Sequence, residues 1–181
     1  MNRILILIIL IVSFVTSSLA DIIKNINVEG NNRVSKETII LFGEIKLNEE
    51  IDAIKLNNII KNLYETKFFK DVSITISNNN LEIKVVENPL VQSVSIEGIK
   101  NKNIIKILRE NMTLKEKSSF VPSIANDDKK KLLNILRSNG YYKAKIKQNY
   151  IESPNNTVDL VYNVSLGKKA SIKKIRFIGD K

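Results

Sequence analysis

The sequence predicts an α+β protein made of two copies of a β-α-α-β-β unit. Short stretches of alternating polar and apolar residues end at Gly30, Gly98 and Gly179, which is typical of half-buried strands that run into turns. After Gly30 and again after Gly98, apolar residues recur at helical spacing and then alternate across a short polar turn. Because the order of these patterns is the same in both parts, we expect domains repeated in tandem.

The first copy contains two predicted helices followed by a hairpin. Ser35 can cap a short helix near 36–42, and a second helix begins near Asp52 with apolar residues on one face. Apolar and polar residues then alternate over 72–77 and over 81–85, on either side of a run of asparagines. This alternation predicts a β-hairpin. The apolar face of the second helix consists of Leu56, Ile59, Ile60, Leu63 and Tyr64.

The second copy follows the same order and ends near Gly167. We expect a strand, two helices and a hairpin, and then one more strand that follows the second copy. The expected ranges are 91–97 for the first strand, 102–111 and 124–138 for the helices, 143–152 and 157–166 for the hairpin, and 170–178 for the last strand.

The composition excludes several kinds of active site. The chain has 181 residues and a formal charge of +10, and it contains neither cysteine nor histidine. Disulfide bridges, thiolate or imidazole zinc sites and the usual catalytic triads are therefore impossible. The excess of basic residues suits an anionic partner such as nucleic acid or a membrane. The 30 Ile, 24 Lys and 23 Asn residues favour a second explanation, a coding bias of an AT-rich genome.

Two pairs of carboxylates are the candidates for acid and base catalysis, namely Asp127-Asp128 and Glu49-Glu50. Both pairs lie at or just before a predicted helix start, where the helix dipole favours negative charge. We interpret them as capping or solvated residues. The sequence thus predicts no catalytic residues, no metal site and no cofactor.

The first 20 residues resemble a secretory signal peptide. Arg3 precedes an apolar run, and Ser18-Leu19-Ala20 offers a small-x-small cleavage site before Asp21. The run is shorter than the roughly 20 residues that span a bilayer, so cleavage between Ala20 and Asp21 is favoured over a membrane anchor. Export from the cytoplasm also argues against a nucleic-acid partner.

Several runs of residues, taken in order, resemble the POTRA domains of outer-membrane protein assembly factors. The similarity covers residues 21–181. The runs that carry it are Asp21-Ile22, Val28-Glu29-Gly30-Asn31-Asn32-Arg33-Val34-Ser35, Leu63-Tyr64-Glu65-Thr66-Lys67-Phe68-Phe69-Lys70-Asp71-Val72, Val85-Val86-Glu87-Asn88-Pro89, and Asn155-Asn156-Thr157-Val158-Asp159-Leu160 through to Gly167.

The resemblance implies three-stranded mixed sheets, each covered on one face by two helices. We expect a first POTRA domain at 21–89, a second at 90–167, and the first strand of a truncated third domain at 168–181. In such a protein this region is a periplasmic arm, attached to the outer membrane through a C-terminal barrel that is missing here. The implied partners are unfolded outer-membrane protein precursors and accessory assembly lipoproteins, without nucleic acid.

Two alternatives remain at this point. A translocation or two-partner-secretion transporter also carries POTRA domains in front of a barrel. A nucleic-acid-binding module of the KH type has a similar order of elements, but its Gly-x-x-Gly loop is missing from 43–51 and from 112–123.

The resemblance also implies where partners bind. In POTRA domains the third strand is central and the second lies at a sheet edge, where an extended partner can pair with the backbone. In the second copy, Lys143, Lys145 and Lys147 lie on the polar face of this edge strand and could instead block edge-to-edge aggregation. The candidate edge residues are Val72, Ser73, Ile74, Thr75 and Ile76 in the first copy, and Lys145, Ile146, Lys147, Gln148, Asn149 and Tyr150 in the second.

Overall fold

The computed structural model describes residues 21–176 and 178–179, which fall into two compact units. One unit ends at Glu87 and the other begins at Asn88. The signal-peptide prediction falls on residues 1–20, outside the described part. No helix of the described ranges combines the length and the apolar character that a bilayer crossing requires.

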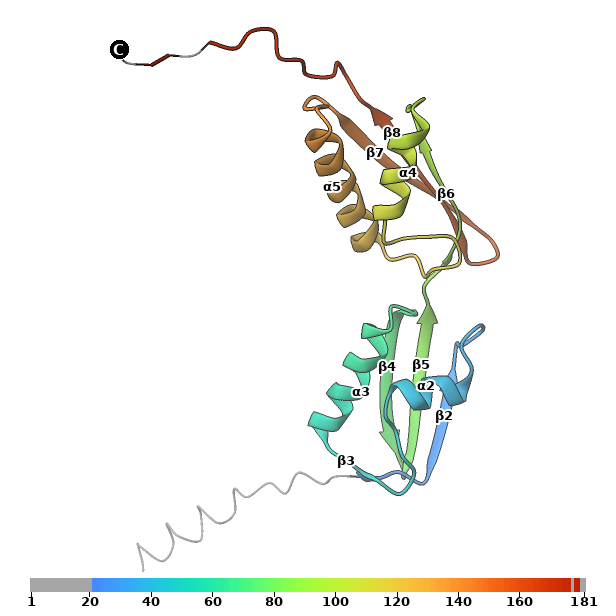
Figure 1. Ribbon diagram of the computed structural model, residues 1–181. Coiled ribbons are helices and arrows are strands. Elements are labelled where there is room, and N and C mark those ends of the chain that lie inside the picture. Colours follow the sequence, from blue (N-terminus) through green and yellow to red (C-terminus); the bar gives the residue numbers. More distant parts are fainter. Residues whose placement is uncertain (1–20, 177, 180–181) are drawn as a thin grey trace, which may run out of the picture. The chain divides into compact units, whose positions relative to one another are not determined.

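The first unit is a three-stranded mixed sheet with two helices on one face (Figure 1). The strand order is β2-β5-β4, with β2 parallel and β4 antiparallel to the central β5. β1 and β3 form a separate two-stranded antiparallel sheet, which the sequence patterns did not reveal. The elements are β1 (Asp21–Ile22), β2 (Asn25–Glu29), α2 (Lys36–Phe42), β3 (Glu50–Ile51), α3 (Ala53–Glu65), β4 (Phe69–Ser77) and β5 (Asn80–Glu87).

The core of the first unit lies between the sheet and the helices. Ile59 and Leu63 of α3 are fully buried, as the helical spacing of apolar residues predicted. Leu81 and Ile83 of β5 face them, because alternate residues of a strand share one face. The cap at Ser35 is as expected, since its side chain accepts from the Thr38 N–H. Asp52, near which the sequence predicts the start of the second helix, accepts from the Lys55 N–H.

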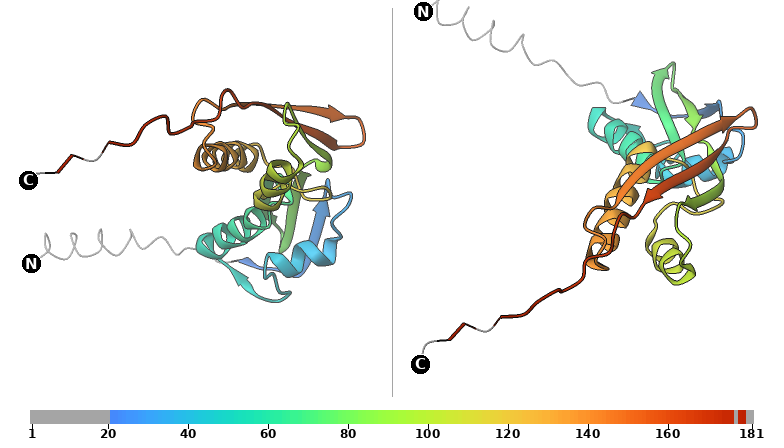
Figure 2. Two further views of the ribbon diagram at one scale, coloured as in Figure 1. Left: turned by 45° about the horizontal axis from the view of Figure 1, so that its top comes forward. Right: turned by 90° about the horizontal axis from the view of Figure 1, so that it is seen from above.

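The second unit repeats this arrangement with the strand order β6-β8-β7. The helices α4 and α5 cover one face of the sheet, and the β7–β8 hairpin lies along α5 (Figure 2). Tyr162 of the central strand is fully buried, and its hydroxyl donates to the Ala125 carbonyl at 3.2 Å. The elements are β6 (Leu90–Glu97), α4 (Lys102–Asn111), α5 (Pro122–Ser138), β7 (Lys145–Ser153) and β8 (Thr157–Ser165).

The last strand predicted from the sequence does not form in the described residues. Residues 168–176 and 178–179 have no strand pairing and are exposed. The prediction of a strand at 170–178 is therefore corrected for these residues. The reason is physical, because an extended segment becomes a strand only when a neighbouring strand accepts its hydrogen bonds. That residues 168–181 belong to a third domain stays a prediction.

Two glycines occupy equivalent places in the two units, and each lies against the central strand. Gly30 and Gly98 have φ angles of +84° and +83°. A Cβ at Gly30 would overlap the carbonyl oxygen of Val85, and one at Gly98 would overlap that of Val164. In each unit the chain therefore needs a glycine at the end of the first strand, because a side chain there would collide with the backbone of the central strand.

A buried carboxylate holds the turn after Gly30. Glu87 accepts backbone N–H groups from Asn32, Arg33 and Val34 at 2.8–3.0 Å and pairs with Arg33 Nε at 3.0 Å. Burial alone would raise the pKa of Glu87. The backbone hydrogen bonds and the Arg33 charge outweigh burial, so the pKa is lowered from its usual 4.5.

We expect Gly98→Ala to destabilise the second unit by about 2 kcal/mol or more, because the methyl group meets a backbone oxygen and φ is positive. Urea unfolding followed by circular dichroism measures this change. Gly179→Ala is the control, since nothing lies within 4 Å of that position. Equal stability of the two variants would contradict the close approach at Gly98.

We expect Glu87→Gln to lower the free energy of unfolding by about 2 kcal/mol at neutral pH. Because the folded pKa is depressed, the contribution of the carboxylate is complete above the usual 4.5 and is lost as the pH falls below it. Thermal unfolding at pH 7 and at about pH 3 should therefore show a smaller difference at the acidic pH. Glu65→Gln, at an exposed side chain, should change stability little at either pH.

Candidate edge-strand binding sites

The predicted site residues lie on edge strands of separate units, so the structure places them in two sites. Among the strands of the described residues, β4 pairs only with β5, and β7 pairs only with β8. Each of these strands therefore directs half of its backbone N–H and C=O groups away from the sheet. A hydrogen bond at the start of β4 shows which residues direct their backbone groups away from the sheet.

On β4, residues whose side chains face the helices turn their backbone outward. The Val72 N–H donates to the Tyr64 hydroxyl at 3.1 Å, and this hydroxyl donates to Asp71 Oδ1 at 3.2 Å. Side-chain face and hydrogen-bond direction alternate together along a strand. Ile74 and Ile76, which share a face with Val72, therefore also present their backbone groups to the free edge.

The β4 candidates differ in availability. At Val72 the outward N–H is already bound by Tyr64, so the edge is closed there. Ile74 and Ile76 are half-buried, and no hydrogen bond to their outward groups forms within the described part of the chain. Ser73 and Thr75 are exposed on the helix-free face, where Thr75 Oγ1 lies 3.4 Å from Glu82 Oε2. The open length of β4 is short.

The β7 edge is open from its beginning. Ile146 pairs with Val164 as Val72 pairs with Val85, so Ile146 is the counterpart of Val72 in the second unit. No tyrosine hydroxyl takes its N–H, and no other hydrogen bond to the outer side of β7 forms among the described residues. Ile146, Gln148 and Tyr150 all share this outward direction.

The remaining β7 candidates point to the helix-free face. Lys145, Lys147 and Asn149 are exposed and lie opposite Ser165, Asn163 and Val161. Neither lysine forms an ion pair with any described residue. Such side chains can keep a second sheet edge away by charge, yet they leave the outward backbone of Ile146 and Gln148 accessible. Tyr150 is 44% exposed and packs against Phe120 with ring centroids 4.8 Å apart.

The other edge of each sheet is partly covered by the chain itself. In the first unit, Lys36 Nζ donates to the Ile26 carbonyl of β2 at 2.6 Å. In the second, Val91 of β6 donates to Ser118 O and accepts from Lys117 N, each at 2.8 Å. These covers involve a side chain and a loop from distant places in the sequence. The alternation of polar and apolar residues gives no signal of them.

Asp128 is a correction to the interpretation of paired carboxylates as capping or solvated residues. It lies inside α5, is 1% exposed, and accepts N–H groups from Thr113 and Leu114 at 2.8–3.0 Å. The carboxylate thus fixes the loop between α4 and α5. Its i, i+3, i+7 spacing with the buried Ala125 and Leu132 is the signal in the sequence that indicates a buried position.

The charge of Asp128 also acts on the core tyrosine. Burial raises the pKa of the Tyr162 hydroxyl, and the Asp128 carboxylate raises it further. Tyr162 therefore stays protonated and keeps its hydrogen bond to Ala125 O. Neighbouring Asp127 is exposed and pairs with Lys130 at 2.9 Å, as expected for a solvated residue. Glu49 pairs with Lys55 of α3 at 3.1 Å.

Comparisons with known proteins agree with this architecture. The family described as "POTRA: Surface antigen variable number repeat" matches residues 89–167. The outer membrane protein assembly factor BamA of Neisseria meningitidis serogroup B is 29% identical over 166 residues, which are 90% of this chain and 21% of the relative. BamA of Neorickettsia risticii is 25% identical over 162 residues, 89% of this chain and 22% of the relative.

A solved structure shares the fold. The N-terminal domain of Omp85 from the thermophilic cyanobacterium Thermosynechococcus elongatus superposes with a TM-score of 0.54 and 16% identity. The match covers 78% of this chain and 61% of the solved one. At this identity the likeness concerns the fold alone.

The family match falls on the second unit, so residues 89–167 share the sequence pattern of POTRA domains as well as a β-α-α-β-β architecture. Over most of its length, the chain is similar to proteins named outer membrane protein assembly factor BamA. It spans about a fifth of the length of these curated relatives.

We expect Asp128→Ala to destabilise the second unit by roughly 2–3 kcal/mol, because the Thr113 and Leu114 N–H groups lose a charged acceptor in a buried place. Urea unfolding measures the loss. Asp127→Ala is the matched control, since this neighbour is exposed and its removal should cost about 0.5 kcal/mol or less. Similar losses in both variants would show that Asp128 does not hold the loop.

Proposed function

We propose that this chain is the periplasmic POTRA arm of an outer-membrane protein assembly factor, and that it binds unfolded barrel precursors by strand addition. The observation that carries the proposal is the outer edge of β7, which stays open along Ile146, Gln148 and Tyr150. An extended precursor segment can pair there through its backbone, which requires no particular sequence. This tolerance suits an arm that handles many different precursors.

The two candidate edges have different parts in this proposal. On β4, the Tyr64 hydroxyl already occupies the first outward N–H, at Val72. On β7, the equivalent position at Ile146 is available, so a longer ladder of hydrogen bonds can form. We therefore infer that β7 is the main site and that β4 offers a shorter one at Ile74 and Ile76.

The wider context follows from the relatives. Their names describe outer membrane protein assembly factors, so we place this chain in the periplasm, as a part of a protein held at the outer membrane. Accessory lipoproteins are further candidate partners. The domains expected at 21–89 and 90–167 act as successive POTRA domains. The role is binding and guidance of strands without bond chemistry, so it requires no catalytic residue and no cofactor.

We expect Ile146→Pro and Gln148→Pro to weaken binding of a synthetic peptide that copies a transmembrane strand of a barrel protein. Proline removes an outward N–H and leaves the pairing with β8 intact. The loss of one hydrogen bond of about 1 kcal/mol corresponds to roughly fivefold weaker binding. Chemical-shift titration of the labelled chain by NMR measures the affinity.

The matched controls are Ile146→Ala and Gln148→Ala, which remove the same side chains but keep the N–H groups. Circular dichroism verifies that all four variants are folded. If the proline and alanine variants bind the peptide equally well, the β7 backbone is not the binding site. The lysines of β7 would then serve only to keep sheet edges apart.

A further inference from the structure

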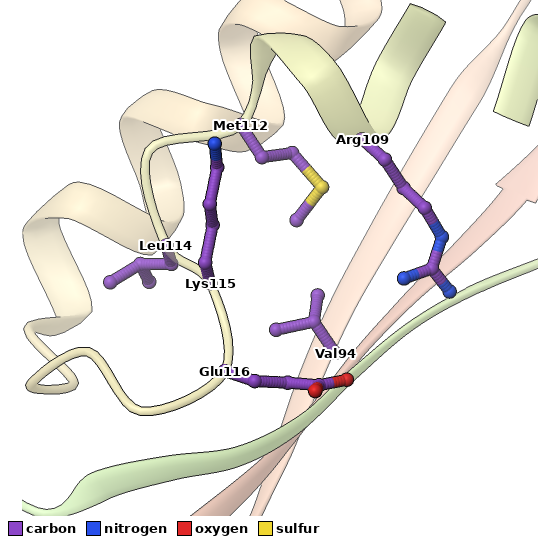
Figure 3. A pocket seen from close by; sticks show the side chains of 6 residues that line it. All are labelled: Val94, Arg109, Met112, Leu114, Lys115 and Glu116. Carbon is purple, nitrogen blue, oxygen red and sulfur yellow. The ribbon is translucent and has the colours of Figure 1, made fainter. Parts of the chain in front are cut away.

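The second edge of the sheet in the second unit, along β6, is open beyond Val91 and borders a pocket. The pocket has a volume of about 310 Å³. Its lining comes from β6, from the end of α4 and from the loop that follows α4, as Figure 3 shows. The lining residues are Val94, Arg109, Met112, Leu114, Lys115 and Glu116.

The backbone beside this pocket faces outward. Val91 directs its N–H and C=O to the loop outside the sheet, and its side chain is buried on the helix face, as are those of Val94 and Ile96. The register with β8 shifts by one residue between Val91 and Ser93, so Val94 returns to the face of Val91 although it lies three residues further on. Because face and hydrogen-bond direction alternate together, Val94 and Ile96 also turn their backbone groups outward. No hydrogen bond to these groups forms among the described residues.

The first unit shows the same direction at the equivalent place. Ile26 precedes Gly30 by four residues, as Val94 precedes Gly98. The outward carbonyl of Ile26 is taken by Lys36 Nζ. The second unit lacks this cover at Val94, so the two sheets differ at their equivalent edges.

The chain itself demonstrates that this edge accepts an extended backbone. Ser119 forms an antiparallel bridge with Leu90, and Lys117 and Ser118 bond to Val91. The loop leaves the edge before Val94 and passes through Glu116, Lys115 and Leu114, which line the pocket. The free part of the edge thus continues an existing pairing at the place where the pocket opens.

The pocket suits one large apolar side chain with an acidic neighbour. Val94, Met112 and Leu114 are buried and supply apolar walls, and in Figure 3 the side chains of Val94 and Met112 point into the same hollow. Arg109 and Lys115 are exposed at the rim and form no ion pair with any described residue. Glu116 is the single acidic lining residue, so the rim carries an excess of positive charge.

We propose that the β6 edge at Val94–Ile96 binds an extended peptide segment that places an apolar side chain between Val94 and Met112 and an acidic side chain beside Arg109. Residues two apart in an extended segment point to the same face, so the acidic residue stands two positions from the apolar one. This inference rests on the proposed function, because the partner is again an extended segment. The β6 edge would be a second binding edge of the same sheet, and it would prefer particular side chains in the bound peptide.

The test is an NMR titration of the whole labelled chain with a synthetic peptide of alternating threonine and valine. The peptide carries a central phenylalanine and a glutamate two residues further on. We expect shifts at the amides of Val94–Glu97 and Leu114–Glu116. Replacement of the phenylalanine by serine should weaken binding at these amides more than about tenfold, since the burial of one aromatic side chain is lost.

Arg109→Glu tests the charge at the rim. We expect binding of the glutamate peptide at the β6 amides to weaken about threefold, the range of an exposed ion pair. Arg137→Glu is the matched control, because Arg137 is an exposed arginine in the last turn of α5, as Arg109 is in the last turn of α4. This control should bind as the unchanged chain does.

Each outcome decides between the proposals. Shifts confined to β4 or β7 would overturn the β6 site and leave the proposed function standing. The absence of shifts on every strand would overturn both. Shifts at β6 that rise with protein concentration without peptide would overturn the peptide site, because a second copy of the chain would then be the occupant. Equal binding of the phenylalanine and serine peptides would likewise exclude the pocket.

Discussion

The backbone pairing of a three-stranded sheet is the constraint on which the rest of this structure depends. Within the described part of the chain, only the central strand of each three-stranded sheet, β5 in one unit and β8 in the other, has strand partners on both sides. The two outer strands each leave half of their N–H and C=O groups without a strand partner. A small domain cannot bury these groups, so each must find a side chain, a loop, water or another chain.

The two units meet this constraint differently, although their sheets have the same order. In the first, Lys36 covers the β2 edge at Ile26, and Tyr64 covers the opposite edge at Val72 of β4. In the second, the loop at 117–119 covers only the start of β6, and β7 has no cover among the described residues. The function proposed here depends on this difference, since an edge that is free of its own chain is available to a partner. Asp128 contributes by fixing the loop that borders the β6 pocket.

Local patterns in the sequence predicted the elements well, because strand alternation, helical spacing and turn residues act over a few neighbours. The hairpins, the helix cap at Ser35, the helix start near Asp52 and the glycine turns follow from such patterns. Contacts between distant residues could not be predicted in this way. The Tyr64 hydroxyl on Val72, the buried carboxylate of Asp128 and the Lys36 cover all depend on how elements pack. They decide which part of each edge remains open.

Residue-resolved amide hydrogen exchange tests whether the β7 edge is open, since it reports whether each outward N–H has a partner. In the free chain, the N–H groups of Val72 and Val91 should exchange slowly. Those of Ile146 and Gln148 should exchange quickly and become protected when an unfolded barrel-strand peptide is added. Slow exchange at Ile146 and Gln148 in the free chain would show that the β7 edge is already covered, and no added protection with the peptide would show that it does not bind an extended strand.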